Sequence, residues 1–383
     1  MTLNIITTTA QLKQFCTHAS IKSFITIDTE FMRDTSYYSK LCLVQIATDE
    51  NAVIVDPLSK DIDLNSLYDL LLNKKVEKVF HAAKQDVEIF YFAMGKVPTP
   101  IFDTQVASMV LGYGDQIGYD TLVSKVLGIH IDKGARFTDW SRRPLTEKQL
   151  QYAIGDVTHL MHVYIRLKAQ LAEQRRENWT DEEMLLITTA KGYDLNPKHA
   201  YKRLKFRTMT SRTLAVLREV ACVRELYAQK KNRPRRHIMK DESLLDIASS
   251  KPNNINELTK IRRMEQNLNK EYANDILEAV QMGLNTEEDL PVIEKKRPIL
   301  EGEQAIIDLL KALLKDCAQN SNVTPRILAS TEDLKTIAQE ENPDVPAVKG
   351  WRKEIFGNRA LGLKEGKTAL AVKDGKLAFI DIS

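Results

Sequence analysis

The spacing of hydrophobic and polar residues predicts alternating strands and helices in the first 175 residues. Short runs rich in β-branched and aromatic residues alternate there with amphipathic helical patterns. We expect strands near 23–31, 41–48, 52–56, 76–82 and 101–105, and helices over 64–74, 86–95, 103–112, 119–128 and 147–176. Because only three residues separate 41–48 from 52–56, these two strands are expected to form a hairpin, which makes the sheet mixed rather than purely parallel.

Beyond residue 176 the pattern becomes helical. Hydrophobic residues recur at helical spacing over 211–285 and again over 306–337. The sequence at 180–183, Thr-Asp-Glu-Glu, predicts a capping box that starts a linking helix. Near the end of the chain, alternation over 369–382 around Asp374-Gly375 predicts a β-hairpin.

These patterns divide the chain into successive parts. A length of 383 residues fits two or three domains, at roughly 150 residues each. We predict an α/β domain over 1–176, a helical linker over 177–205, a first helical domain over 206–290 and a second over 300–383. A polar segment over 284–301 is expected to join the two helical domains.

Composition excludes several classes of protein. No run of about 18 apolar residues is present, so no transmembrane helix and no membrane partner are expected. The N-terminus lacks the basic and long apolar stretches of a signal peptide. The cysteines, Cys16, Cys42, Cys222 and Cys317, form no CxxC pair, which indicates a reducing cytoplasm and argues against a zinc site.

Positive charge is concentrated in one part of the chain. The net charge is only +3, but residues 201–300 contain 21 basic and 14 acidic residues, a surplus of +7. Such a surface attracts the phosphates of nucleic acid irrespective of base sequence. An ordinary charged helical surface is the alternative.

The first of three acidic patches follows a buried strand. The run Ile25-Thr26-Ile27 leads into Asp28-Thr29-Glu30. Because residues i and i+2 of a strand point to the same face, Asp28 and Glu30 are expected to project side by side. Two carboxylates so placed repel each other and favour a bound cation, although two solvated charges at a strand tip remain the simpler interpretation of this patch alone.

The second patch lies where the strand near 76–82 meets the next helix. Asp86 falls at this junction, where capping the helix N-terminus is the usual role of Asp and a site carboxylate is the alternative. His81 is expected to be a hydrogen-bonded residue at the strand end rather than a ligand.

The third patch lies on a long helix. Thr146 and Gln149 fit a capping box, so the helix is expected to begin near Glu147. Tyr152 and Asp156 are then four residues apart and neighbours on one helical face. In one interpretation Asp156 binds a metal ion and the Tyr152 hydroxyl contacts the water on that metal. In the other, Tyr152 lies at the edge of the core and Asp156 is solvated.

The three patches together favour a metal site. Hard cations such as Mg²⁺ take oxygen ligands, and two ions about 3.5–4 Å apart can stabilise both the attacking and the leaving oxygen of an in-line displacement at phosphorus. Such a site needs carboxylates that converge from different elements, and a hydroxyl near the attacking water completes it.

At these residues the chain resembles a known family. Asp28-Thr29-Glu30, Asp86 and Tyr152-x-x-x-Asp156 resemble the motifs of the DEDD exonucleases, in the subgroup with tyrosine in the third motif. The segments 41–47 and 139–145 are similar to ribonuclease D specifically.

This resemblance implies a fold, a site and an activity. The fold is an α/β, ribonuclease H-like exonuclease domain with a mixed sheet, followed by two all-α domains. Asp28, Glu30, Asp86 and Asp156 bind two divalent metal ions, Mg²⁺ or Mn²⁺, and Tyr152 positions the attacking water. The enzyme removes mononucleotides from a free RNA 3′ end, with transfer RNA precursors as the expected substrates.

The helical region resembles the helicase-and-RNase-D C-terminal (HRDC) domain, a small nucleic-acid-binding module. The positions that match are Arg224, Pro234, Leu244, Ala248, Pro252, Leu258 and Ile261, whereas a tryptophan often found before the arginine is missing. The last 80 residues are similar to a more divergent second HRDC domain. Trp351 lies there and is expected in the core, with a base-stacking platform as the alternative.

The segment 113–143 is expected to contain a loop over the site. Arg136, Arg142 and Arg143 lie in it, either as contacts to the RNA backbone or as solvated charges. Two other functions remain open: a 3′→5′ DNA exonuclease with the same site, and a catalytically silent RNA-binding scaffold.

Overall fold

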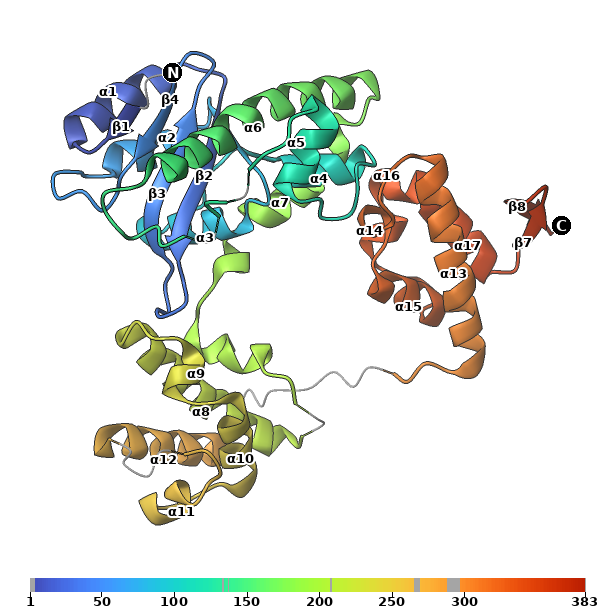
Figure 1. Cartoon of the computed structure of the whole chain (residues 1–383). Coiled ribbons are helices and arrows are strands. Elements are labelled where there is room, and N and C mark those ends of the chain that lie inside the picture. The colour runs from blue at the N-terminus through green and yellow to red at the C-terminus, as the bar shows by residue number, and fades with distance from the viewer. Residues whose placement is uncertain are drawn as a thin grey trace.

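A mixed β-sheet with covering helices and two separate groups of helices make up the protein, seen here in a computed structural model (Figure 1). The structure describes residues 4–132, 134–136, 138–206, 209–264, 269–287 and 297–382. No helix in this described part combines the length and the apolar character that crossing a membrane requires. The segment 288–296, half of the expected polar connection between the helical domains, lies outside the described residues.

Within the described residues, six strands form the N-terminal sheet. They are β1 (Asn4–Ile6), β2 (Phe24–Met32), β3 (Lys40–Ala47), β4 (Ala52–Val55), β5 (Glu77–Phe80) and β6 (Ile101–Asp103), in the order β1-β4-β3-β2-β5-β6. The β2–β3 and β3–β4 pairs are antiparallel, whereas β1–β4, β2–β5 and β5–β6 are parallel. The expected mixed sheet and the 41–56 hairpin are therefore confirmed.

Helices surround this sheet. They are α1 (Thr9–Ala19), α2 (Asn65–Leu72), α3 (Lys84–Met94), α4 (Thr104–Val110), α5 (Tyr119–Leu127) and α6 (Glu147–Glu173). The capping box predicted for α6 is present, since the Thr146 hydroxyl accepts from the Gln149 backbone and the Gln149 side chain accepts from the Thr146 backbone. Strand β1 and helix α1 were not among the elements expected from the sequence.

Helix α6 is tied to strand β2 beside the acidic residues. The Thr26 hydroxyl is fully buried and donates to the Val157 carbonyl at 2.8 Å. Thr26 precedes Asp28 by two residues on the same face of β2, and Val157 directly follows Asp156 on α6. One buried hydrogen bond thus fixes the strand carboxylates opposite the helix carboxylate.

The first helical group comprises residues 197–287. It contains a 3₁₀ helix (Pro197–Arg203), α8 (Ser211–Lys230), α9 (Arg235–Ile238), α10 (Asp241–Ser250), α11 (Ile255–Thr259) and α12 (Lys270–Asn285). Helices α8 and α12 pack so closely that a Cβ on Gly283 would lie 2.4 Å from the Val216 Cα. Glycine is the residue that permits this approach.

The linking helix α7 (Asp181–Thr188) forms as expected, but its predicted capping box is wrong. The Thr180 hydroxyl donates to the Glu177 carbonyl at 2.8 Å instead of accepting from α7. Glu182 and Glu183 instead pair with the buried guanidinium of Arg352, the Glu183 contact measuring 2.6 Å. A tertiary ion pair has replaced the local cap.

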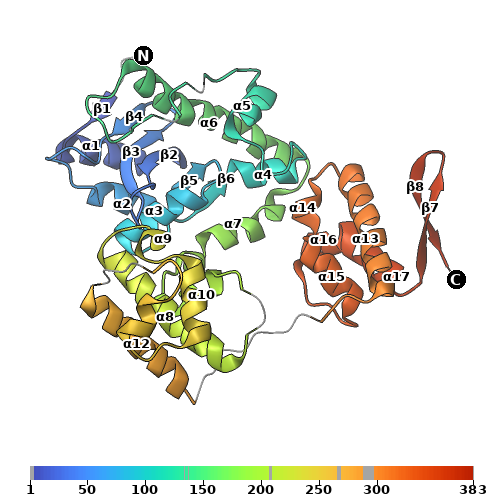
Figure 2. The same cartoon turned by 60° about the horizontal axis from the view of Figure 1, so that its bottom comes forward.

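The second helical group comprises residues 297–382. It contains α13 (Glu301–Asn320), α14 (Pro325–Leu328), α15 (Thr331–Gln339), α16 (Gly350–Arg352), a π-helical turn (Lys353–Gly357), α17 (Asn358–Lys364), β7 (Thr368–Lys373) and β8 (Lys376–Asp381). Strands β7 and β8 pair as the expected hairpin, which projects away from the helices in both views (Figures 1 and 2).

This group docks on the N-terminal part through stacked aromatic rings. The Trp351 ring lies on Trp179, with centroids 4.3 Å apart and planes 4° from parallel, and Trp351 is only 9% exposed. Arg176 donates from Nη1 to the Val110 carbonyl at 3.0 Å and from Nη2 to the Ser321 carbonyl at 2.6 Å. Trp351 is therefore a core residue, and its ring face is not open to a base. The domain boundaries at 176, 205, 290 and 300 stay predictions.

Candidate active site

A polar cavity of about 660 Å³ opens where β2, α3, α5 and α6 meet. Strand β2 lines it from Asp28 onward, α3 supplies Asp86, and α6 supplies Tyr152 and Asp156. All five residues that the sequence nominated thus face one cavity, although they are spread over more than 120 positions of the chain.

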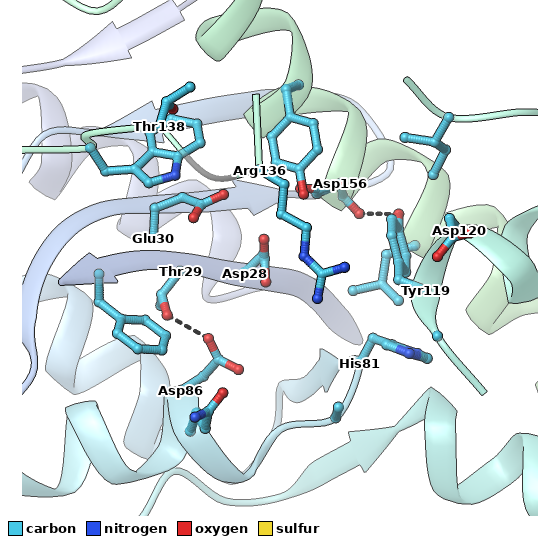
Figure 3. Close-up of a pocket in the computed structure, with 18 of the residues that line it drawn as sticks. Asp28, Thr29, Glu30, His81, Asp86, Tyr119, Asp120, Arg136, Thr138 and Asp156 are labelled. Atoms are coloured by element: carbon cyan, nitrogen blue, oxygen red, sulfur yellow. Dashed lines mark hydrogen bonds between the residues drawn. The ribbon is translucent and has the colours of Figure 1, made fainter. Parts of the chain in front are cut away.

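Three of the carboxylates form a tight cluster. One oxygen from each of Asp28, Glu30 and Asp156 lies within 4.8 Å of the other two. The i, i+2 alternation of β2 places the first two on one face, as expected, and α6 brings the third against them. Figure 3 shows these side chains facing one another in the cavity.

Asp86 lies in the same cavity, outside that three-residue cluster. It is 7% exposed, and its Oδ1 accepts a hydrogen bond from the Thr29 hydroxyl (Figure 3). Asp86 does not cap the helix, the usual role of Asp at such a junction, because α3 begins two residues earlier, at Lys84. Asp103 of β6 accepts there instead, from the backbone N–H groups of Ala82 at 3.0 Å and Ala83 at 2.9 Å.

The electrostatics of the cluster call for a cation. Burial raises the pKa of Asp28 to about 6. Burial, followed by repulsion from Asp28 and Asp156, raises the pKa of Glu30 to about 10. The pKa values of Asp86 and Asp156 also lie well above the usual range, chiefly through burial and then through the charge of Asp28.

Asp156 also has an unsatisfied atom. Its buried Oδ1 has no hydrogen-bond partner among the described residues. A buried carboxylate oxygen without a donor is costly unless a cation supplies the missing interaction. The donor set is all oxygen, which matches the preference of Mg²⁺ and Mn²⁺. The residues present therefore fit a divalent metal.

Tyr152 stands beside the carboxylates as a protonated phenol. Burial, then the charges of Asp156 and Glu30, raise the pKa of its hydroxyl above the usual value. A hydrogen bond from this hydroxyl to Asp156 lowers the pKa of that carboxyl, against the larger effect of burial. The raised pKa favours the protonated phenol, which donates a hydrogen bond to Asp156.

Two further residues that line the cavity were not nominated as site residues. Tyr119 of α5 donates from its hydroxyl to the backbone carbonyl of Asp156. His81 is hydrogen-bonded as expected, with Nδ1 3.0 Å from the Thr104 hydroxyl and Nε2 3.0 Å from the Ile117 carbonyl. Burial lowers the pKa of His81, which favours the neutral ring. No local sequence signal links Tyr119 to Asp156, because the contact spans 37 residues.

The three arginines of the 113–143 segment lie in different surroundings. Arg143 forms a bidentate ion pair with Asp56, in which Nε and Nη2 each lie 2.7 Å from a carboxylate oxygen. Its Nη2 also donates to the Cys42 carbonyl at 2.8 Å. These contacts anchor its loop to the sheet. Arg142 is exposed. Arg136 lines the cavity and lowers the pKa values of Glu30 and Asp156 (Figure 3).

Comparison with known proteins extends over the whole chain. Residues 3–172 match the family model for a 3′-5′ exonuclease, and residues 213–280 match the HRDC domain. The ribonuclease D of Nitrobacter hamburgensis is 46% identical over 383 residues and 100% of both chains. That of Bartonella henselae is 43% identical over 378 residues, 98% of this chain and 93% of the relative.

A solved structure shares the same fold. The crystal structure of Escherichia coli RNase D, described as an exoribonuclease involved in structured RNA processing, matches with a TM-score of 0.81. The two sequences are 25% identical, and the match covers 96% of this chain and 99% of that one. The expected fold, an exonuclease domain with a mixed sheet followed by an HRDC region, is thereby confirmed.

Proposed function

The chain belongs to the ribonuclease D family and is a 3′→5′ exoribonuclease, and from this premise we propose that it releases mononucleotides by two-metal hydrolysis in the acidic cavity. The observation that carries this proposal is the convergence of Asp28, Glu30 and Asp156 within 4.8 Å around an unsatisfied carboxylate oxygen. Asp86, held by Thr29 at the side of the same cavity, completes the set of four carboxylates.

Each residue has a distinct part in this proposal. The four carboxylates would hold two divalent ions, Mg²⁺ or Mn²⁺, which stabilise the attacking and the leaving oxygen of the displacement. Tyr152 orients the attacking water through its hydroxyl oxygen, which can accept from that water while its own proton is donated to Asp156. Tyr119 holds the α6 backbone at Asp156 and so keeps that carboxylate aimed at the cavity.

The substrate in this proposal is RNA with a free 3′ end, and transfer RNA precursors are the expected class. The surplus of positive charge over residues 201–300 supports a phosphate-binding surface next to the exonuclease part. The four cysteines are free thiols, three of them buried, which is consistent with the cytoplasm as the place of action.

Substrate choice can be tested directly. The protein should shorten a transfer RNA precursor that has a 3′ trailer, and it should degrade a DNA strand of the same sequence much more slowly. Equal rates on RNA and DNA would favour the alternative function of a 3′→5′ DNA exonuclease. Trimming of an unstructured RNA at the same rate as the precursor would remove transfer RNA precursors as the preferred class.

Arg136 is expected to contact the scissile phosphate. Arg136→Gln should lower kcat/KM by about 30-fold, because a hydrogen bond to a charged group contributes about 2 kcal/mol. It should also move the activity profile to higher pH, since Arg136 lowers the pKa values of Glu30 and Asp156 and their ionisation then needs more base. Steady-state kinetics from pH 6 to 9 measure both effects. Arg142→Gln, the same change at a residue that does not line the cavity, serves as the control and should leave kcat/KM unaltered.

A further inference from the structure

The wall of the acidic cavity continues into a loop that leaves the exonuclease part. Strand β2 ends at Met32, and Met32, Arg33 and Asp34 all line the cavity. The chain then runs through residues 33–39, here called the β2–β3 loop, before β3 begins at Lys40. Arg33 pairs with Glu88 of α3 at 3.1 Å, which holds the start of the loop.

The middle of this loop is inserted into the first helical group. Tyr37 is only 7% exposed, and its hydroxyl donates to Glu225 of α8. The same oxygen accepts from Gln229 at 3.2 Å and from Arg235 at 2.8 Å. The Arg235 guanidinium also lies over the Tyr37 ring, 4.5 Å from its centroid. One tyrosine of the exonuclease part is thus enclosed by three side chains of α8 and α9.

The receiving pocket is built around a buried charge. The Glu225 side chain is fully buried and accepts from Arg235 at 2.6 and 2.7 Å and from Arg203 at 2.9 Å. Two guanidinium groups therefore fix this carboxylate within the first helical group. A buried carboxylate held in this way is a rigid acceptor for the phenol.

A second contact fixes the loop backbone. The Asn232 Oδ1 accepts from the N–H groups of Tyr37 at 3.1 Å and Tyr38 at 3.0 Å. Asn232 has a φ of +46°, a left-handed conformation that Asn tolerates better than most residues. On the other side of the loop, the Tyr38 ring packs edge-on against Phe92 of α3, with centroids 5.4 Å apart.

We propose that the first helical group positions the active site. Its hydrogen bonds to the Tyr37 side chain and to the backbone of Tyr37 and Tyr38 hold the β2–β3 loop in place. The loop in turn holds the Met32–Asp34 wall of the cavity against the bound nucleotide. The helical group then has a part in every catalytic cycle, including cycles on substrates too short to touch its basic surface. Tyr37 and Asn232 are positioning residues, since they reach the substrate only through the loop. The inference rests on the proposed location of the active site.

The test uses the full-length protein and two substrates. The p-nitrophenyl ester of uridine 5′-monophosphate carries a single phosphodiester and fills only the cavity, whereas a long RNA also reaches the helical groups. Asn232→Gly removes the acceptor and keeps the left-handed backbone, and Asn232→Asp keeps the acceptor. Tyr37→Ala removes the inserted ring.

Loss of the contact is expected to raise KM for the ester by about tenfold in Tyr37→Ala and about threefold in Asn232→Gly, because a mispositioned wall weakens binding in the cavity. Asn232→Asp should restore the original KM. On the long RNA, kcat/KM should fall by the same factors. If Tyr37→Ala does not fold, the comparison of Asn232→Gly with Asn232→Asp is a sufficient test, because neither variant removes a packed ring.

Two results would overturn the inference. An unchanged KM for the ester would mean that the helical group does not position the cavity wall. A fall confined to kcat would mean that the contact only keeps more molecules folded. Failure of the proposed active site is distinguishable, because it would appear as retained activity when Asp28 is replaced by Asn, whatever happens at Tyr37.

Discussion

Asp28→Asn is expected to lower the rate of RNA hydrolysis on the order of 10⁴-fold, about 5 kcal/mol of transition-state stabilisation. The reason is that a neutral amide replaces a carboxylate at the centre of the cluster, beside Glu30 and Asp156. RNA binding should remain largely intact, since the surplus of positive charge lies elsewhere, over residues 201–300. The measurements are single-turnover hydrolysis and the Kd for an RNA under conditions without cleavage.

The same variant should make the metal-free protein more stable at pH 8. The folded-state pKa of Asp28 is about 6, above its ordinary value of 3.8. The folded state therefore binds this proton more tightly, and the resulting stability is full below pH 3.8 and is lost as the pH rises to about 6. Above that range the ionised carboxylate costs up to about 3 kcal/mol, which Asn removes.

Thermal unfolding in the presence of chelator checks this second effect. Asp28→Asn should raise Tm by a few degrees at pH 8 and by much less at pH 4. Asp69→Asn makes the same chemical change at an exposed position of α2 and should alter neither Tm nor the rate. Near-normal hydrolysis by the Asp28 variant would refute the site assignment.

Tyr152→Phe should lower kcat by about 10²-fold while metal affinity and KM stay unchanged. Phenylalanine keeps the ring beside Trp140, whose centroid lies 6.1 Å away, and removes only the hydroxyl. Since burial and the nearby carboxylates keep that hydroxyl protonated, the loss is one of water orientation rather than of a general base. The pH dependence of the remaining activity should therefore keep the shape seen with the natural residue.

Metal titration and steady-state kinetics together test this role. Tyr68→Phe on α2 is the matched control outside the cavity and should behave like the unaltered protein. An unchanged kcat at equal metal affinity would remove Tyr152 from the mechanism. A parallel loss of metal affinity would instead make it a support for Asp156.

The site was predictable where local geometry determines it. Alternation along a strand is enough to place Asp28 beside Glu30, and the four-residue spacing on a helix is enough to place Tyr152 beside Asp156. The capping box at Thr146 sets the register of that helix. Which elements converge was implied only by the resemblance to a family, because contacts such as Thr26 to Val157 span 131 residues.

Some features that were not predicted had a signal in the sequence and others had none. Helix α1 has a capping box at Thr8 and Gln11, and its buried residues Leu12, Phe15, Cys16 and Ala19 follow helical spacing. This pattern is sufficient to predict the helix. In contrast, Thr180 has the sequence of a cap, but the ion pairs of Arg352, about 170 residues away, override it. The contact between Tyr37 and Asn232 spans 195 residues and follows from no local rule.

The most direct test of the central claim is a time course on a 5′-labelled RNA that has a single-stranded 3′ tail, with Mg²⁺, with chelator, and with the Asp28→Asn protein in parallel. A ladder that shortens by one nucleotide at a time from the 3′ end, seen only with metal and only with the unaltered protein, is the predicted result. Intact RNA in the presence of Mg²⁺ and of Mn²⁺, or an equal ladder from Asp28→Asn, would contradict the claim that the acidic cavity hydrolyses RNA.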